Sequence, residues 1–128
     1  MSDARQRLGR AAEALVAHSL ESRGMRIVTR NARTSSVRGE IDLIALDGRA
    51  LVFVEVKALR ATALAGPERP AMSVGHRKLH KLRSLALAWL RDHAGSAPPH
   101  STLRFDVVGL RLDSRGRPVD WEHVREAF

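Results

Sequence analysis

The stretch Gly39–Lys57, GEIDLIALDGRALVFVEVK, decides the fold of this 128-residue chain. Its alternating and branched apolar residues predict two strands, Glu40–Leu46 and Ala50–Lys57. The dipeptide Asp47-Gly48 lies between them and favours a tight hairpin in which these two residues form the loop. The stretch therefore predicts two antiparallel neighbours in one sheet.

Three charged side chains of this hairpin are predicted to share one face of the sheet. Side chains alternate along a strand, and if Asp47 and Gly48 are the two loop residues, Asp42 lies opposite Phe53. Asp42 is then diagonal to Glu55 at about 7 to 8 Å, and Lys57 is the next residue on that face. A three-residue loop would instead shift the register by one and separate these side chains. Two carboxylates repel each other unless a cation compensates them. The hairpin therefore predicts either a metal site or a simple ion pair between Glu55 and Lys57.

An Asp/Glu pair beside a lysine has the composition of a phosphodiester hydrolysis site. Mg²⁺ binds one or two carboxylates together with waters and phosphate oxygens. The bound ion polarises the phosphate and lowers the pKa of a water molecule, while Lys57 would steady that water or the developing negative charge. Asp42, Glu55 and Lys57 are therefore the candidate catalytic residues, with Mg²⁺ or Mn²⁺ as the expected ion.

The segments around the hairpin predict an α/β protein. Good helix formers from Ala4 to about Arg23 end at Gly24, and Met25–Arg30 follows as a strand. The order α-β-β-β-α-β predicts one layered domain over residues 1–128. The other predicted segments are a loop at Asn31–Gly39, a long loop at Ala58–Met72, a helix at Ser73–Asp92 with Ser73 as N-cap, a strand at Thr102–Leu112, a turn at Asp113–Pro118 and a terminal element of open type at Trp121–Phe128.

The charge of the chain favours a polyanionic partner. The formal net charge is +8, which would attract nucleic acid, although a solvated basic surface is the alternative. No apolar run approaches the roughly 18 residues of a membrane helix, and no signal-peptide pattern opens the chain. Without cysteine there are no disulfides or thiolate metal sites. These features favour a cytoplasmic protein that binds no membrane.

Further charged residues are candidates for the same site. Glu13 lies on a small, apolar patch of the first helix and needs a partner, either the metal ion or an arginine. Arg30, Arg33 and Arg38 flank the acids and favour phosphate contacts over a plain charged surface. The second helix carries further basic residues, Arg77, Lys78, Lys81 and Arg83, of which Lys78 is a candidate nucleic-acid contact. Trp89 of this helix is expected in the core. His76 and His80 could bind a transition metal, but they lack a third ligand nearby, and a solvated helix edge is the alternative.

At these residues the sequence resembles the YraN-like family of small bacterial proteins. That family in turn resembles the PD-(D/E)xK, restriction-endonuclease-like nucleases and the Holliday-junction resolvases. The resemblance spans nearly the whole chain. Its marks are Gly9 with Glu13, the residues Arg30, Asn31 and Arg33, the segments Gly39–Ile44 and Phe53–Lys57, Lys78 ahead of Ala86 and Leu90, and Arg104–Val108.

The resemblance implies a restriction-endonuclease-like, three-layer core in which helices flank a mixed sheet. It implies Asp42, Glu55 and the Val56 carbonyl as metal ligands and Lys57 as the catalytic lysine. Glu13 matches the helix glutamate of the resolvase-like branch. Likeness to a nuclease family does not by itself establish activity.

Three features depart from the nuclease pattern. Ile41 stands where many of these nucleases carry a proline. An arginine is expected two positions after the lysine, but Leu59 stands there and Arg60 follows, so Arg60 is the candidate for that substrate contact. The long loop after Arg60 does not align with the family. Substrate contacts are therefore less defined than the metal ligands.

Together these observations predict a Mg²⁺-dependent endonuclease that acts on structured DNA. One alternative is a nucleic-acid-binding or scaffold protein that kept the nuclease fold and cleaves little. Another is a protein-interaction module that binds an acidic partner, which salt-sensitive preference for DNA would exclude. By analogy with resolvases, which cut two strands as pairs, a homodimer is expected.

Overall fold

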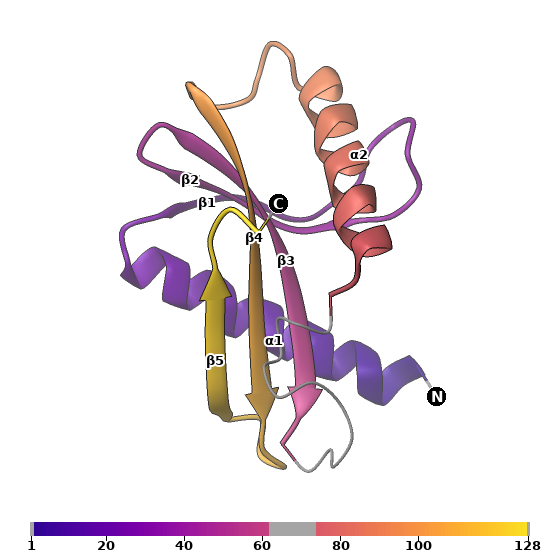
Figure 1. The fold of residues 1–128 in the computed structure, drawn as a ribbon, viewed down its shortest axis with the longest axis vertical. Coiled ribbons are helices and arrows are strands. Elements are labelled where there is room, and N and C mark those ends of the chain that lie inside the picture. Colours follow the sequence, from indigo (N-terminus) through magenta and orange to yellow (C-terminus); the bar gives the residue numbers. More distant parts are fainter. Residues whose placement is uncertain (1, 62–73, 128) are drawn as a thin grey trace.

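A five-stranded mixed sheet carries one helix on each face in the computed structural model, which describes residues 2–61 and 74–127 (Figure 1). The strands lie in sequence order, with β3 and β4 parallel and all other neighbours antiparallel. The predicted mixed α/β class is therefore confirmed, with one strand more than expected. The elements are α1 Ser2–Ser22, β1 Arg26–Ala32, β2 Ile41–Asp47, β3 Ala50–Arg60, α2 His76–Asp92, β4 Thr102–Leu112 and β5 Pro118–Val124.

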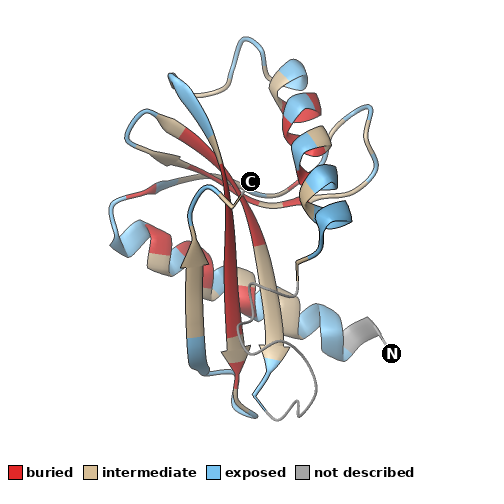
Figure 2. Cartoon of the chain, viewed as in Figure 1, coloured by how far each residue is buried: buried red, intermediate tan, exposed pale blue. Residues whose placement is uncertain are grey.

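Two apolar clusters, one on each face, hold the helices to the sheet (Figure 2). Leu43 and Val54 point toward α1, whereas their neighbours Ile44 and Phe53 point toward α2. Both faces of the central strands are covered, which is why the sequence of β3 reads as a nearly continuous apolar run. Trp89 is buried with its ring edge-on to Phe53, as expected of a core residue. No helix of the described part of the chain is long and apolar enough to cross a membrane.

The β2–β3 hairpin turns one residue later than predicted. Asp47 pairs with Ala50, so the loop residues are Gly48 and Arg49 and the predicted Asp47-Gly48 loop is wrong. Gly48 adopts φ 60°, which fits glycine at the first loop position of a type II′ turn. Moving a two-residue loop by one position changes every cross-strand pairing by two. Because the side-chain period is also two, each side chain keeps its predicted face.

Strand pairing explains three differences from the prediction: β1 and β3 extend further along the chain than predicted, and β5 was not predicted as a strand. β1 continues to Ala32, which pairs with Ile41 of β2. β3 continues into the predicted loop as far as Arg60, because it remains paired with β4 over its whole length. The terminal element is β5, which pairs with the last half of β4. Residues 62–72 of the predicted loop lie outside the described residues, as does Ser73.

The second helix starts later than predicted. α2 begins at His76 with Gly75 as its N-cap, so the prediction of Ser73 as N-cap is wrong. The carbonyl of Gly75 accepts the N–H groups of Lys78 and Leu79, at 3.1 and 3.2 Å. The helix end at Asp92 and the strand at Thr102–Leu112 agree with the sequence prediction.

The first helix ends as predicted, at a glycine in the left-handed region. Gly24 has φ 91°, and the N–H of Met25 donates to the carbonyl of Leu20 at 3.0 Å. We expect Gly24→Ala to lower the free energy of unfolding by about 1 to 2 kcal/mol, because a side chain is strained in this conformation. Urea denaturation would measure the change. Gly95→Ala is the control, since Gly95 has neither a positive φ nor a neighbour near its Cβ position, and equal losses in both variants would contradict the prediction.

Candidate active site

A row of polar residues crosses three neighbouring strands. In the β1–β2 register Asn31 lies across from Asp42, between two observed pairs. In the β2–β3 register, one step beyond the pair of Leu43 and Val54, Asp42 lies across from Glu55. The sequence had set the two acids on a diagonal, and directly opposed side chains lie closer together than diagonal ones. The shifted turn therefore brings the two carboxylates nearer to each other than predicted.

Asp42 is a carboxylate whose surroundings oppose its charge. Burial and the neighbouring Glu55 carboxylate raise the pKa of Asp42 to about 7, although a hydrogen bond from the backbone lowers it. That bond comes from the N–H of Val56, which donates to Asp42 Oδ2 at 2.9 Å. The N–H and carbonyl of one strand residue point toward the same neighbouring strand. The Val56 carbonyl, a predicted metal ligand, therefore faces the same side as the acid pair.

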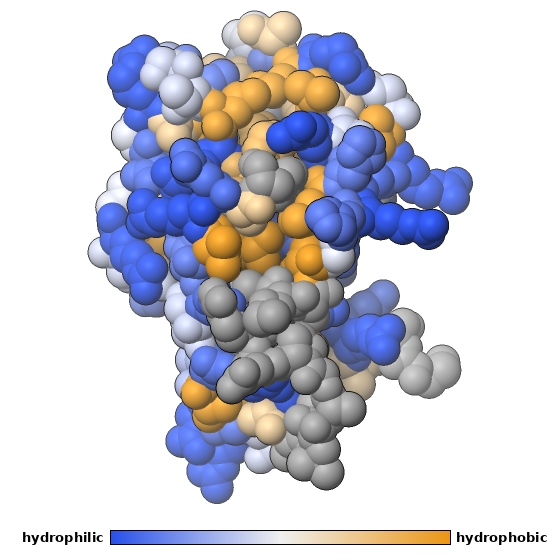
Figure 3. Space-filling view, in the orientation of Figure 1, coloured by the Kyte–Doolittle hydropathy of each residue, from blue (hydrophilic) through white to orange (hydrophobic). Residues whose placement is uncertain are grey.

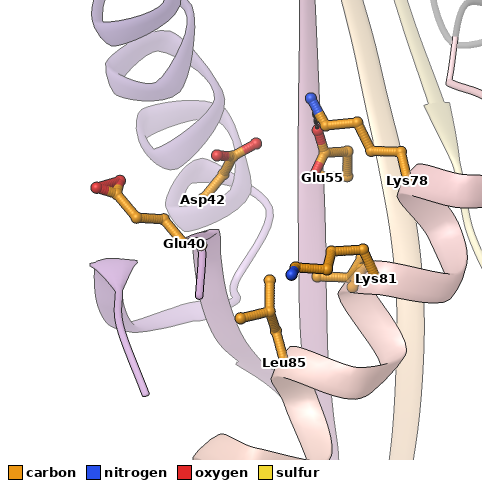
Figure 4. Close-up of a pocket in the computed structure, with 8 residues that line it drawn as sticks. Glu40, Asp42, Glu55, Lys78, Lys81 and Leu85 are labelled. Atoms are coloured by element: carbon orange, nitrogen blue, oxygen red, sulfur yellow. Dashed lines mark ion pairs between the residues drawn. The ribbon is translucent and has the colours of Figure 1, made fainter. Parts of the chain in front are cut away.

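Glu55 is buried and pairs with a lysine from the second helix. Its side chain is 6% exposed, and Lys78 Nζ lies 3.1 Å from Glu55 Oε2 (Figure 4). Burial raises the pKa of Glu55, while the positive charges of Lys78 and Lys57 oppose this. In turn the Glu55 carboxylate raises the pKa of Lys78. Lys78, predicted only as a phosphate contact, is thus part of the acid pair's immediate environment.

Lys57 follows Glu55 on the same face of β3, two residues along the strand. It is half-buried and close enough for its charge to lower the pKa of Glu55. Within the described residues, however, the ion pair of Glu55 is made by Lys78 and not by Lys57. The alternative of a simple Glu55–Lys57 salt bridge is therefore wrong. Lys57 is left beside the acid pair with its ammonium group available for another partner.

Two cavities share Glu40 as a lining residue. The first, about 260 Å³, contains the acid pair on the α2 side and is also lined by Lys78 and Lys81. Figure 4 shows Asp42 and Glu55 projecting from neighbouring strands while both lysines reach over from α2. The second, about 300 Å³, lies on the α1 side and contains Glu13. Glu40 lines both cavities, so they adjoin each other at the start of β2.

Glu13 is held beside the acid pair by an asparagine. Asn31 Nδ2 donates to Glu13 Oε1 at 2.9 Å, so the partner of Glu13 is an amide and not the arginine considered from the sequence. The charge of Glu13 raises the pKa of both Asp42 and Glu55. Yet the described residues bring no three His, Cys, Asp or Glu side chains together as a metal-holding group. That Glu13 completes a metal shell stays a prediction.

The sequence did not assign a role to Asn31. It fell in a predicted loop, whereas the structure places it at the end of β1 with φ 51°. Asparagine tolerates positive φ better than most residues, and this backbone sets its side chain against α1. The signals available were its polar side chain and its place among the marks of the family resemblance, and neither indicates its long-range partner.

The predicted phosphate contacts lie at different distances from the acids. Arg33 is exposed and donates to Glu40 at 2.7 Å, and Arg30 and Arg38 are exposed on β1 and on the β1–β2 loop. Arg60 ends β3, about 16 Å along the strand from Glu55 at 3.3 Å per residue. The structure therefore keeps Lys78 and Arg33 at the cavities and sets Arg60 apart from them. The space-filling view shows hydrophilic side chains projecting where α2 begins (Figure 3).

The residues present fit a small divalent cation. Two carboxylates and one backbone carbonyl are hard oxygen donors, which Mg²⁺ prefers, and Mg²⁺ uses one or two carboxylates and fills its other positions with water or phosphate. The half-buried Asp42 and the buried Glu55 repel each other, and they are the part of the protein whose charge such a cation would stabilise. His76 and His80 do not belong to a three-residue metal group within the described part of the chain.

The fold and the site define a class: an α/β protein with a helix on each face of a mixed sheet and a pair of acids, Asp42 and Glu55, beside lysines. Residues 12–110 match the family described as "Uncharacterised protein family UPF0102". This chain belongs to the UPF0102 family. The resemblance to the YraN-like family is thereby confirmed, while the likeness of that family to nucleases stays a prediction.

Relatives cover almost the entire chain. A "UPF0102 protein" of Streptomyces griseus is 46% identical over 123 residues, which are 96% of this chain and 97% of the relative. Another from Arthrobacter sp. is 47% identical over 122 residues, 95% and 96% of the two chains. One from Pelotomaculum thermopropionicum is 38% identical over 128 residues and covers both chains fully. The chain therefore matches these relatives from end to end.

Proposed function

We propose that this chain is a metal-dependent endonuclease that cuts structured DNA, with Asp42, Glu55 and Lys57 as its active centre. The observation that carries the proposal is the pair of directly opposed carboxylates, the buried Glu55 and the half-buried Asp42, in which the pKa of Asp42 is raised to about 7. Such a pair is costly to the fold unless a cation compensates it, and perturbed acids in a cavity are typical of functional sites.

Each residue of the centre has a distinct task in this proposal. Asp42, Glu55 and the Val56 carbonyl would hold Mg²⁺ or Mn²⁺, which supplies Lewis-acid polarisation of the phosphate and a more acidic water. Lys57 would place its ammonium group against the phosphate oxygens that gain negative charge during cleavage. Its lack of an ion pair to Glu55 leaves it available for this contact. Lys78, which is 58% exposed, reaches both Glu55 and the open side of the cavity.

A polynucleotide is the partner that the charge distribution supports. The chain has a net charge of +8, and Lys78 and Lys81 line the cavity of a centre that is itself acidic. Basic walls around a cavity raise the local concentration of a polyanion and bind its phosphates, while the acid pair requires the cation. Lys81 lines the cavity without an ion pair to a described acid, so it is available to a phosphate.

A second function is favoured by one observation. Lys78 already compensates Glu55 at 3.1 Å, so the acid pair is partly satisfied by the protein's own cation. Together with Leu59 at the position where an arginine is expected, this supports a protein that binds nucleic acid on the same fold and cleaves little. The two functions share a binding surface and differ in whether the phosphodiester bond is broken.

The test is a panel of labelled substrates: a four-way junction, a flap, a single strand, a duplex and a structured RNA, each with Mg²⁺, Mn²⁺ or EDTA. We expect cleavage of a branched DNA with either metal and none with EDTA, because the acid pair requires the cation. Denaturing gels would measure the products, and anisotropy would measure binding. Binding without cleavage under every metal condition would instead establish the binding protein. If neither binding nor cleavage occurs, both functions are excluded.

A further inference from the structure

The cavity on the α1 side of Asp42 is not used by the three residues of the proposed centre. It measures about 300 Å³, and its lining is strongly polar, with Arg10, Glu13 and Asn31 among its residues. Glu40 also lines the cavity of the acid pair, so the two spaces adjoin at the start of β2. A chain molecule that crosses Asp42 from the α2 side therefore reaches this second cavity.

Gly9 forms part of the wall of this second cavity, in the interior of α1. Glycine inside a helix is less stable than alanine because it loses more backbone freedom on folding. Here the fold does not require it: a Cβ built at Gly9 meets no atom within 4 Å, and its φ is not positive. The missing side chain leaves room on the outside of the helix. A helix glycine of this kind permits the close approach of an external molecule to the backbone.

The charged groups around Gly9 indicate which kind of ligand would bind there. Arg10 is exposed next to it and forms no ion pair with the described residues, whereas Arg33, which directly follows β1, is paired with Glu40. Asn31 and Glu13 bind each other and so present fixed polar atoms. A guanidinium matches a phosphate. A lone anion would also meet the carboxylates of Glu13 and Glu40, but a nucleotide additionally offers hydroxyl and amino donors to them.

We infer that this cavity binds one nucleotide of the DNA strand adjoining the phosphate at the acid pair, with its sugar–phosphate backbone against Gly9 and its phosphate on Arg10. The identity of the ligand as DNA rests on the proposed function. The location of the subsite rests on the cavity, the open helix glycine and the unpaired arginine. It adds a second point of contact, which fixes the direction in which the strand crosses Asp42.

Gly9→Ala separates this role from a structural one, because the two roles predict changes of opposite sign. Alanine has a higher helix propensity than glycine, so the Gly9→Ala variant is expected to have a higher midpoint of urea denaturation than wild type. The added methyl group would fill the space of the ligand and weaken binding of a labelled four-way junction about tenfold. Arg10→Ala should weaken the same binding and reduce its dependence on log salt by about one. Arg7→Ala, an exposed cation of α1 outside the cavity, is the matched control.

Binding is measured by anisotropy in EDTA, so the result does not depend on catalysis. Weaker binding by Gly9→Ala and Arg10→Ala, with Arg7→Ala closer to wild type, supports the subsite. If wild type binds and cuts DNA but both variants bind as wild type does, the subsite is overturned and the proposed function stands. If wild type binds no nucleic acid either in EDTA or with Mg²⁺ or Mn²⁺, both fail together. If the two variants lose affinity for an RNA hairpin but not for the DNA junction, the assignment of the ligand to DNA is overturned.

Discussion

Replacing Lys57 with alanine is expected to slow DNA cleavage by about 10²- to 10³-fold, the usual cost of removing one group that stabilises charge in the transition state. The lysine follows Glu55 on the same face of β3, and Lys78 rather than Lys57 forms the ion pair with that acid. Its removal therefore takes away a charge that is available to substrate while the ion pair of Glu55 remains. Single-turnover rates on the substrate that wild type cuts best would measure the effect, provided that enzyme exceeds substrate.

Two variants control this prediction. Arg49→Ala removes an exposed cation at the loop of the same hairpin, far from the acids, and should cut at nearly the wild-type rate. Lys57→Arg keeps the charge on a planar, bulkier head and should recover part of the lost rate. The junction should bind to Lys57→Ala within a few-fold of wild type, since one phosphate contact among several is lost. An unchanged rate for Lys57→Ala would exclude it from the active centre.

The hairpin shows how much of this site the sequence contains. Alternating side chains and an Asp-Gly turn predicted two strands, and they predicted that Asp42, Glu55 and Lys57 share a face. The turn was misplaced by one residue, but that error changed the pairing by two and preserved the faces. Local pattern therefore specified which side chains meet, while the precise opposition of the acids depended on a backbone choice at Gly48.

The partners of the acids were outside the reach of local pattern. Lys78 belongs to α2 and contacts Glu55 of β3, and Asn31 at the end of β1 contacts Glu13 of α1. Such contacts arise from the packing of α1 and α2 against the sheet, and no periodic pattern in the sequence indicates them. β5 was not predicted for a related reason: none of its residues is fully buried, and its strand character depends on pairing with β4. Tertiary context decides such elements.

A second charged cluster, away from the acid pair, was noted in the sequence only as a family mark. Asp106 on β4 is fully buried and receives two hydrogen bonds from Arg104, at 3.0 and 3.1 Å. His123 Nε2 lies 2.7 Å from it, and the N–H of Glu126 donates to it at 3.1 Å. Arg104 also reaches Asp47 at 2.9 Å. Asp106 thus connects β4 with β5 and the C-terminal segment, and Arg104 extends the cluster to the end of β2.

Asp106→Ala is expected to lower the free energy of unfolding by about 3 to 5 kcal/mol, because it leaves buried partners without their counter-charge. The side chains of Arg104 and His123 are 12% and 6% exposed, so water replaces little of the lost interaction. Against a typical total of about 5 to 15 kcal/mol this is a large fraction. Urea denaturation with circular dichroism would measure it. Asp106→Asn, which retains the shape and some hydrogen bonds, provides a value if the alanine variant does not fold.

The matched control is Asp120→Ala, which removes an ion pair between the same two strands. Asp120 lies 3.6 Å from Arg111 and is 46% exposed, so its loss should cost less than about 1 kcal/mol. Similar losses at Asp106 and Asp120 would contradict the argument from burial.

The pH dependence of stability gives an independent measure of what the Asp106 carboxylate contributes. Although burial raises it, the hydrogen bonds from His123 and Arg104 hold the pKa of Asp106 below its usual value of 3.8. The unfolded chain therefore takes up this proton at a higher pH than the folded one. The stability that Asp106 contributes is complete above its usual pKa and is lost as the pH falls through its lower folded value. The difference in unfolding free energy between wild type and Asp106→Ala should accordingly shrink in strong acid, whereas a constant difference would mean that the charge of Asp106 contributes nothing.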